Sequence, residues 1–350
     1  MRASDVRRLA CVVAGCGAIA VAVGASAQSS RESSGDGSRQ ERAAVEATVG
    51  PLVAELKAVC PVADPGDQQA FEACRQALFH GSRLRASLGA KLLWGRPNPM
   101  PGTSLKNTSL TQFAPEAWTG LYAPLFMFDG TWRLEDDAVE GLYRARLGAL
   151  FRNALDPGQY PYPFWHSAKK WNDYQNANTL VLWFDSRSGS IVVAQFINDG
   201  QEHPGLRGPP VARPPFDGQW MWTDAKGDAQ PAPALFRGLF SGDNPYLGEL
   251  ERRYRDLAVV LRAGHCNDCH VPANPDGLKR LVLLQTPVHA ASEIKRLMRA
   301  VRDNEMPVDD THLYRDIDPD TRAALLDYGG AFEATVDTAR AWEEEHVKPR

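Results

Sequence analysis

The chain has 350 residues and a formal net charge of −4 at pH 7, with 39 Lys and Arg residues against 43 Asp and Glu residues. This balance argues against nucleic acid and anionic membrane surfaces as binding partners. The length and the changes of composition along the chain predict two domains after an N-terminal leader.

Residues 1–27 have the pattern of a secretory signal peptide. Arginines precede an apolar run over residues 9–24, and Ala-Ser-Ala at 25–27 supplies the small residues that a signal peptidase reads. A lipidated Cys16 is the alternative, but the apolar run continues beyond it, whereas a mature lipoprotein usually continues into polar sequence. No later segment approaches the roughly 18 uninterrupted apolar residues of a membrane span, so we expect none in the mature chain.

The chain after the signal begins with a polar segment and two helical runs. Residues 28–41 are rich in Ser, Gly, Arg and Gln and predict a disordered leader. Helical runs are expected over 41–60 and 67–93. Cys60 and Cys74 flank the turn-rich link between these runs, and in an oxidising compartment we expect them to form a disulfide; two buried free thiols are the alternative.

Several segments further along have the composition of strands. Residues 126–134 carry an Asp-Gly turn signal between aromatic flanks. The strongest hairpin joins 179–185 to 191–197, because both arms are rich in strand-forming residues and the link contains a glycine. Residues 217–222 predict a further strand.

Two other segments lie among these strands. An amphipathic helix is expected over 136–155. The segment 161–174 concentrates aromatic rings beside His166, Lys169 and Lys170, as in a small-molecule or partner pocket, although the aromatic spacing fits a helix face packed on a sheet better. Residues 42–245 are therefore expected to form an α+β domain with a small antiparallel sheet, whose role the sequence does not reveal.

A helical run over 250–261 precedes the most informative motif of the chain. Cys266, Cys269 and His270 form C-x-x-C-H, the pattern of covalent haem attachment. Each thiol can add to one haem vinyl group, and the following imidazole is then held close enough to coordinate the iron. A thioredoxin-like site would need a βαβ pattern around the cysteines, and a zinc site would need a second ligand pair; neither is present in the sequence.

Two residues are candidates for the other axial ligand of the iron. Met306 offers a neutral, soft thioether on a loop that Pro307 stiffens. His289 stands near the start of a predicted helix and would give a bis-His haem with a lower potential. We expect Met306 to be the distal ligand, with His289 as the alternative.

The C-x-x-C-H motif, the Met-Pro pair after an amphipathic helix and the final helical run over 319–328 resemble a class I cytochrome c domain. The resemblance covers roughly the last quarter of the chain. The separation of the motif from Met306 is short for that class, and Arg262 stands where the family often has an aromatic residue.

The resemblance implies an all-α cytochrome c-like domain over 248–343 with one covalent haem c. It implies thioether bonds at Cys266 and Cys269, His270 as proximal ligand and Met306 as distal ligand. The function that it implies is single-electron transfer in the periplasm, with redox proteins as partners. A haem-based sensor or gas binder, or an oxidoreductase whose N-terminal domain binds substrate, are the alternatives, so the sequence leaves open whether the chain is an enzyme.

Overall fold

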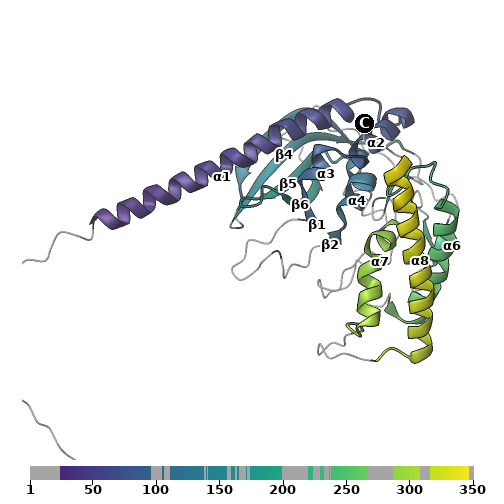
Figure 1. The fold of residues 1–350 in the computed structure, drawn as a ribbon. Helices are drawn as coiled ribbons and strands as arrows, with labels where there is room; N and C mark the ends of the chain where they lie inside the picture. The colour runs from purple at the N-terminus through teal and green to yellow at the C-terminus, as the bar shows by residue number, and fades with distance from the viewer. Residues whose placement is uncertain are drawn as a thin grey trace, which may run out of the picture. The chain divides into compact units, whose positions relative to one another are not determined.

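The fold is described from a computed structural model of the chain (Figure 1). The residues described are 24–95, 105, 111–137, 139, 141–155, 159–161, 164, 171, 174–198, 220–223, 229–231, 236, 238–266, 287–307 and 316–346. Of these, 24–36, 111, 220–223, 229–231 and 287–289 are described by their backbone alone. The chain divides into two compact units, residues 1–42 and 43–350.

Helix α1 spans Gly24–Val59 and includes residues 28–41, for which the composition predicts disorder. Residues 1–23 of the predicted signal peptide lie outside the described residues. In the second unit, the helix buries apolar side chains that recur every three or four residues, which is the spacing of one helix face. These side chains are Val45, Val49, Leu52, Val53 and Leu56.

The central sheet is six-stranded, in the order β2-β1-β6-β5-β4-β3. Strands β1 and β6 pair in parallel and all other neighbours are antiparallel, so the sheet is mixed. The predicted small antiparallel sheet is therefore wrong. The strands are β1 (Leu88–Trp94), β2 (Thr111–Phe113), β3 (Phe126–Asp136), β4 (Leu142–Phe151), β5 (Thr179–Asp185) and β6 (Ile191–Ile197).

The hairpin predicted around residues 186–190 is confirmed, because β5 and β6 pair antiparallel around a turn in which Gly189 has φ 65°. The Asp-Gly pair at residues 129–130 does not separate two strands, however. Strand β3 continues through it, and a register shift between Phe128 and Trp132 marks an irregularity where Gly130 has φ 89°. A left-handed glycine of this kind is typical of a β-bulge.

Strand β4 replaces the amphipathic helix predicted over 136–155. Its alternate residues from Tyr143 to Phe151 enter the main core, whereas Arg144 and Arg146 face the other side and pair with Glu135 of β3. This alternation has the period of a strand. The arginines and small residues between the large apolar side chains also match one face of a helix, which explains the error.

The predicted helix over 67–93 is shorter than expected. Helix α2 (Gln68–Phe79) ends before Gly81, whose φ of 120° favours glycine. Ser82 then accepts a hydrogen bond from Arg85 N as the N-cap of α3 (Arg83–Ser87), and strand β1 follows. Three short helical turns precede β3, namely α4 (Pro115–Ala117), η2 (Trp118–Tyr122) and η3 (Ala123–Leu125).

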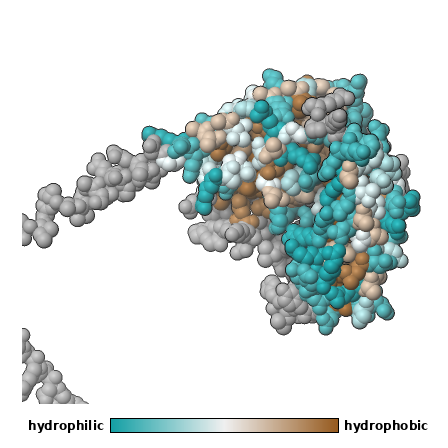
Figure 2. Space-filling model, in the orientation of Figure 1, coloured by the Kyte–Doolittle hydropathy of each residue, from teal (hydrophilic) through white to brown (hydrophobic). Residues whose placement is uncertain are grey.

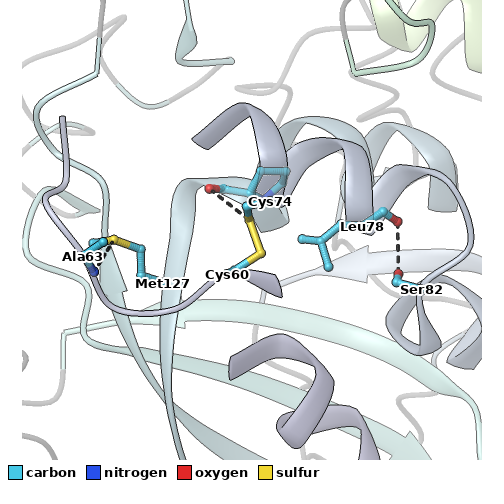
Figure 3. The surroundings of a disulfide bond; sticks show 7 residues. Cys60, Ala63, Cys74, Leu78, Ser82 and Met127 are labelled. Atoms are coloured by element: carbon cyan, nitrogen blue, oxygen red, sulfur yellow. Dashed lines mark hydrogen bonds between the residues drawn. A yellow bond between two sulfur atoms is a disulfide. The ribbon is translucent and has the colours of Figure 1, made fainter. Parts of the chain in front are cut away.

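The predicted disulfide between Cys60 and Cys74 is confirmed, with an S–S distance of 2.04 Å. It joins the end of α1 to α2, and both cysteines are fully buried (Figure 3). On one side Ala63 N donates to Met127 Sδ at 3.4 Å, and on the other Ser82 Oγ donates to Leu78 O at 3.0 Å.

The C-terminal region contains a small two-stranded sheet and three long helices. Strands β7 (Trp220–Thr223) and β8 (Ala229–Pro231) pair antiparallel. The helices are α6 (Leu247–Ala263), α7 (Pro287–Arg302) and α8 (Pro319–His346). Within the described ranges, no helix has the length and apolar character needed to cross a membrane.

One hydrophobic core runs from α1 through the inner face of the sheet to α6, α7 and α8, and α7 also contacts α4. The expected all-α cytochrome c-like domain is therefore wrong as a fold assignment, because the three helices complete a core that they share with a mixed sheet. A second, smaller cluster on the other sheet face includes Val181, Trp183 and Val193. Figure 2 shows hydrophobic residues over the strands on one side and a mainly hydrophilic surface over α7.

Candidate functional site

The C-x-x-C-H motif begins where α6 ends. Gly264 N donates to Val260 O at 2.8 Å and His265 N donates to Arg262 O at 3.0 Å, which closes the last turn of the helix. His265 has φ 58°, the left-handed conformation that commonly follows a helix end. Cys266 is the next residue, and its half-buried side chain packs against the hydrophobic core. Cys269 and His270 lie outside the described residues.

The start of the motif lies against the first turn of α8. A Cβ on Gly264 would be 2.9 Å from Thr321 Cγ2 and 3.6 Å from Cys266 Sγ, so a glycine allows this close approach. Thr321 is itself held, because its N and Oγ1 donate to Asp318 Oδ2 at 2.9 and 3.0 Å. These two hydrogen bonds hold the pKa of Asp318 below its ordinary value.

The opposite end of α6 lies beside the last turns of α8. Ser241 N and Oγ donate to Glu343 Oε1 at 2.6 and 2.8 Å, and Asn244 Nδ2 donates to the same oxygen at 3.0 Å. These donors precede α6 by only a few residues, whereas Gly264 at its other end contacts Thr321. Helices α6 and α8 are therefore antiparallel.

Helix α7 also runs antiparallel to α8. At its C-terminal end, Arg322 Nη2 donates to Val301 O at 3.1 Å and to Arg302 O at 2.6 Å. At its N-terminal end, Arg340 Nη2 donates to Ala291 O at 3.2 Å. Because α6 and α7 both oppose α8, their C-terminal ends lie at the same end of the three helices (Figure 1).

Met306 follows α7 at that same end. Asn304, with φ 57°, turns the chain after the helix, and a cis peptide bond joins Met306 to Pro307. The Met306 side chain is 38% exposed. The structure therefore brings the predicted distal ligand to the end of the helices from which Cys266 leaves α6.

The alternative distal ligand, His289, lies at the other end. Its backbone belongs to the first turn of α7, near the level of Arg340 on α8, and its side chain is outside the described atoms. At about 1.5 Å per residue, Thr321 and Arg340 are separated along α8 by roughly 28 Å. The structure thus separates His289 from the first cysteine of the motif.

The residues that the structure describes fit a haem c site in their chemistry. A half-buried thiol on a helix end and an exposed thioether at the same end are the donor types that such a site uses. In the described part of the chain, no group of three or more His, Cys, Asp and Glu side chains is arranged to hold a metal ion. The His166 segment, like the second half of the motif, falls mainly outside it.

Sequence reasoning missed the contribution of Gly264 and Thr321. A glycine two residues before Cys266 and the Asp318-x-x-Thr321 cap were both readable, but only the packing of α6 on α8 brings them together. Comparisons of this chain with family models, with curated proteins and with solved structures found no match. Function is therefore argued from the motif and from the helices around it.

Proposed function

We propose that this chain is an exported c-type cytochrome that carries single electrons through one covalently bound haem c. Cys266 and Cys269 form the thioether bonds, His270 is the proximal ligand and Met306 is the distal ligand. The supporting observation is that Cys266 and Met306 lie at the same end of α6 and α7. The proposal does not depend on the cytochrome c fold, which the structure does not have.

The bound haem would supply an iron that alternates between two oxidation states. The protein residues attach and orient it. Thr321, fixed by Asp318, and the missing side chain of Gly264 set where Cys266 leaves α6. A thioether from Met306 is neutral and favours the reduced iron, which raises the potential relative to bis-His ligation.

Exposed apolar side chains near the motif support docking to a redox partner protein. Val259 on α6 is 59% exposed, and Tyr328 on α8 and Met306 are each 38% exposed. All three lie in the half of the helical region that includes the motif end. Apolar side chains exposed around a haem edge would suit contact with another redox protein.

Export to the periplasm is part of the proposal. The signal-like residues 1–27 support it, and so does the Cys60–Cys74 disulfide, because such bonds persist in oxidising compartments. Haem maturation and disulfide formation would then occur in the same place.

The first test is the absorption spectrum of the exported, purified protein in its oxidised and reduced forms. A c-type spectrum that survives denaturation, and that is lost in Cys269→Ala, would support covalent attachment. The double variant Cys60→Ser/Cys74→Ser is the matched control, since it removes two thiols elsewhere and should keep the spectrum. A wild-type chain without covalent haem would overturn the proposal.

A second test concerns the distal ligand. Met306→Ala should lower the reduction potential and allow carbon monoxide to bind the reduced haem, whereas His289→Ala should change neither. If the two variants behave in the opposite way, His289 is the ligand. Rapid carbon monoxide binding by the wild-type protein would instead favour a haem sensor or an enzyme.

A further inference from the structure

A fully buried arginine in the sheet region makes no ion pair with any residue that the structure describes. Arg152 directly follows β4 and is 0% exposed. Its Nε, Nη1 and Nη2 atoms have no hydrogen-bond partner among the residues that the structure describes. A buried guanidinium normally has both a charge partner and hydrogen bonds, because taking an unpaired charge out of water costs several kcal/mol.

The backbone around Arg152 is firmly held. Arg152 N donates to Leu125 O at 2.7 Å, and Arg152 O accepts a hydrogen bond from Tyr160 Oη at 2.8 Å. The same Tyr160 oxygen accepts from Leu155 N at 2.8 Å. The backbone position of the arginine is therefore fixed by the fold.

The acidic group that acts on Arg152 is hydrogen-bonded elsewhere. Among the described residues, Asp67 is the acidic group whose charge acts on Arg152, and it makes no ion pair with it. Asp67 Oδ1 instead accepts from Ala70 N at 2.9 Å as the N-cap of α2. The N-terminal end of a helix also carries partial positive charge, so it gives a cation no compensation. Burial lowers the pKa of Arg152 to about 10, which leaves it charged at neutral pH.

The segment that contains Arg152 lies beside the segment that leads into β5, and both carry buried polar side chains. Phe151 N donates to Ala177 O at 3.1 Å, which places the end of β4 beside the segment that leads into β5. The rings of Phe151 and Tyr160 pack against Trp171. The buried polar side chains of the two segments are Asn153, Gln175, Asn176, Asn178 and Thr179.

We propose that Arg152 anchors a buried binding site for a small oxyanion, a carboxylate or a phosphate group, in the sheet region. The planar guanidinium matches either group through two parallel hydrogen bonds. This site is separate from the haem motif and does not rest on the proposed function.

The test is thermal unfolding of the full chain at constant ionic strength, with inorganic phosphate, sulfate or acetate added. At one hundred times the dissociation constant, we expect at least one anion to raise the unfolding temperature by about 5 °C, and to do so saturably. Phosphate saturating at lower concentration than acetate identifies a phosphate site, and the reverse identifies a carboxylate site.

Two variants decide whether the effect belongs to Arg152. Arg152→Met should abolish the rise, whereas Arg146→Met, which removes an arginine of β4 that pairs with Glu135, should keep it. An equal rise in Arg152→Met would overturn the proposal. If Arg152→Met does not fold, calorimetric titration of the wild-type chain decides: saturable binding of one anion per chain supports the site, and no binding of any of the three overturns it.

Discussion

The sheet region, built on β1 to β6, and the helical region, built on α6, α7 and α8, differ in what holds each of them together. In the sheet region, strands β4, β5 and β6 each have a neighbour on both sides, aromatic rings fill the core and a disulfide ties α1 to α2. Helices α6, α7 and α8 add their buried side chains to the same core, while Val259, Tyr328 and Met306 stay exposed in the half of the helical region that includes the motif end. The region with the clearest chemical motif thus shares its core with the sheet region instead of having one of its own.

The two regions meet at residues 236–244. Gly238, with φ 89°, lies against Gly120 of η2, while Phe236 packs against Tyr254 and Phe332 of the helices. A few residues later the chain donates hydrogen bonds to Glu343. Substitutions at this junction, in the sheet region and in the helical region test the comparison.

The junction should show the largest effect. A Cβ on Gly120 would overlap the backbone carbonyl of Gly238, which cannot rotate away. We expect Gly120→Ala to lower the free energy of unfolding by about 3 kcal/mol or more, measured by urea denaturation. Gly242→Ala is the control, because no atom of the described residues lies within 4 Å of its added Cβ. Equal stability of the two variants would contradict this packing.

The disulfide should come next. Cys60 and Cys74 are 14 residues apart, and a closed loop of that length contributes about 3 kcal/mol through the unfolded state. Cys60→Ser/Cys74→Ser should lower the free energy of unfolding, measured by urea denaturation, by about 3 kcal/mol. If the two regions are as separate in role as we argue, haem absorbance per chain should not change in the folded variant.

Within the helical region, two adjacent glycines of α8 should behave oppositely. A Cβ on Gly329 would collide with Met298 Sδ of α7, so we expect Gly329→Ala to cost about 1–3 kcal/mol. Gly330 has open space within 4 Å among the described residues, and Gly330→Ala should stabilise the helix by up to about 1 kcal/mol. Urea denaturation of both variants measures the difference, and equal effects would rule out the proposed packing of α7 on α8.

The smallest effect concerns pH. Burial lowers the pKa of His80 from 6.5; the charges of Arg75 and Arg85 lower it further, and Glu343 opposes them. The unfolded chain therefore binds more protons near pH 6.5 than the folded chain. Stability should be complete above pH 6.5 and should fall as the pH decreases through 6.5 towards the folded-state pKa.

Unfolding curves measured between pH 5 and 8 test this dependence. His80→Gln should flatten it, whereas His346→Gln, at the exposed end of α8, should leave it unchanged. A wild-type free energy of unfolding that increases as the pH falls from 8 to 5 would contradict this prediction.

The parts of the fold that the sequence predicts correctly are those with local signals. The β5–β6 hairpin has strand-forming arms around Gly189, α6 has a clear helical run, and Cys60 and Cys74 flank a short turn. The helix predicted in place of β4 is wrong, because arginines that alternate with apolar residues fit the period of a strand as well as that of a helix.

Long-range packing accounts for the rest. The order of strands that puts β1 beside β6 has no signature in either strand. The choice between Met306 and His289 depends on the direction of α7, which hydrogen bonds from Arg322 and Arg340 reveal. Arg152 is one arginine among many in the sequence, and only its burial distinguishes it.

The burial of the Cys60–Cys74 bond has a consequence for maturation. The four cysteines after residue 27 can pair in three ways, and two of these would join a motif cysteine to Cys60 or Cys74. Once the sheet region has folded, both sulfur atoms of the Cys60–Cys74 bond are buried. Burial shields them from attack by a thiolate, so the two motif cysteines no longer exchange with Cys60 or Cys74.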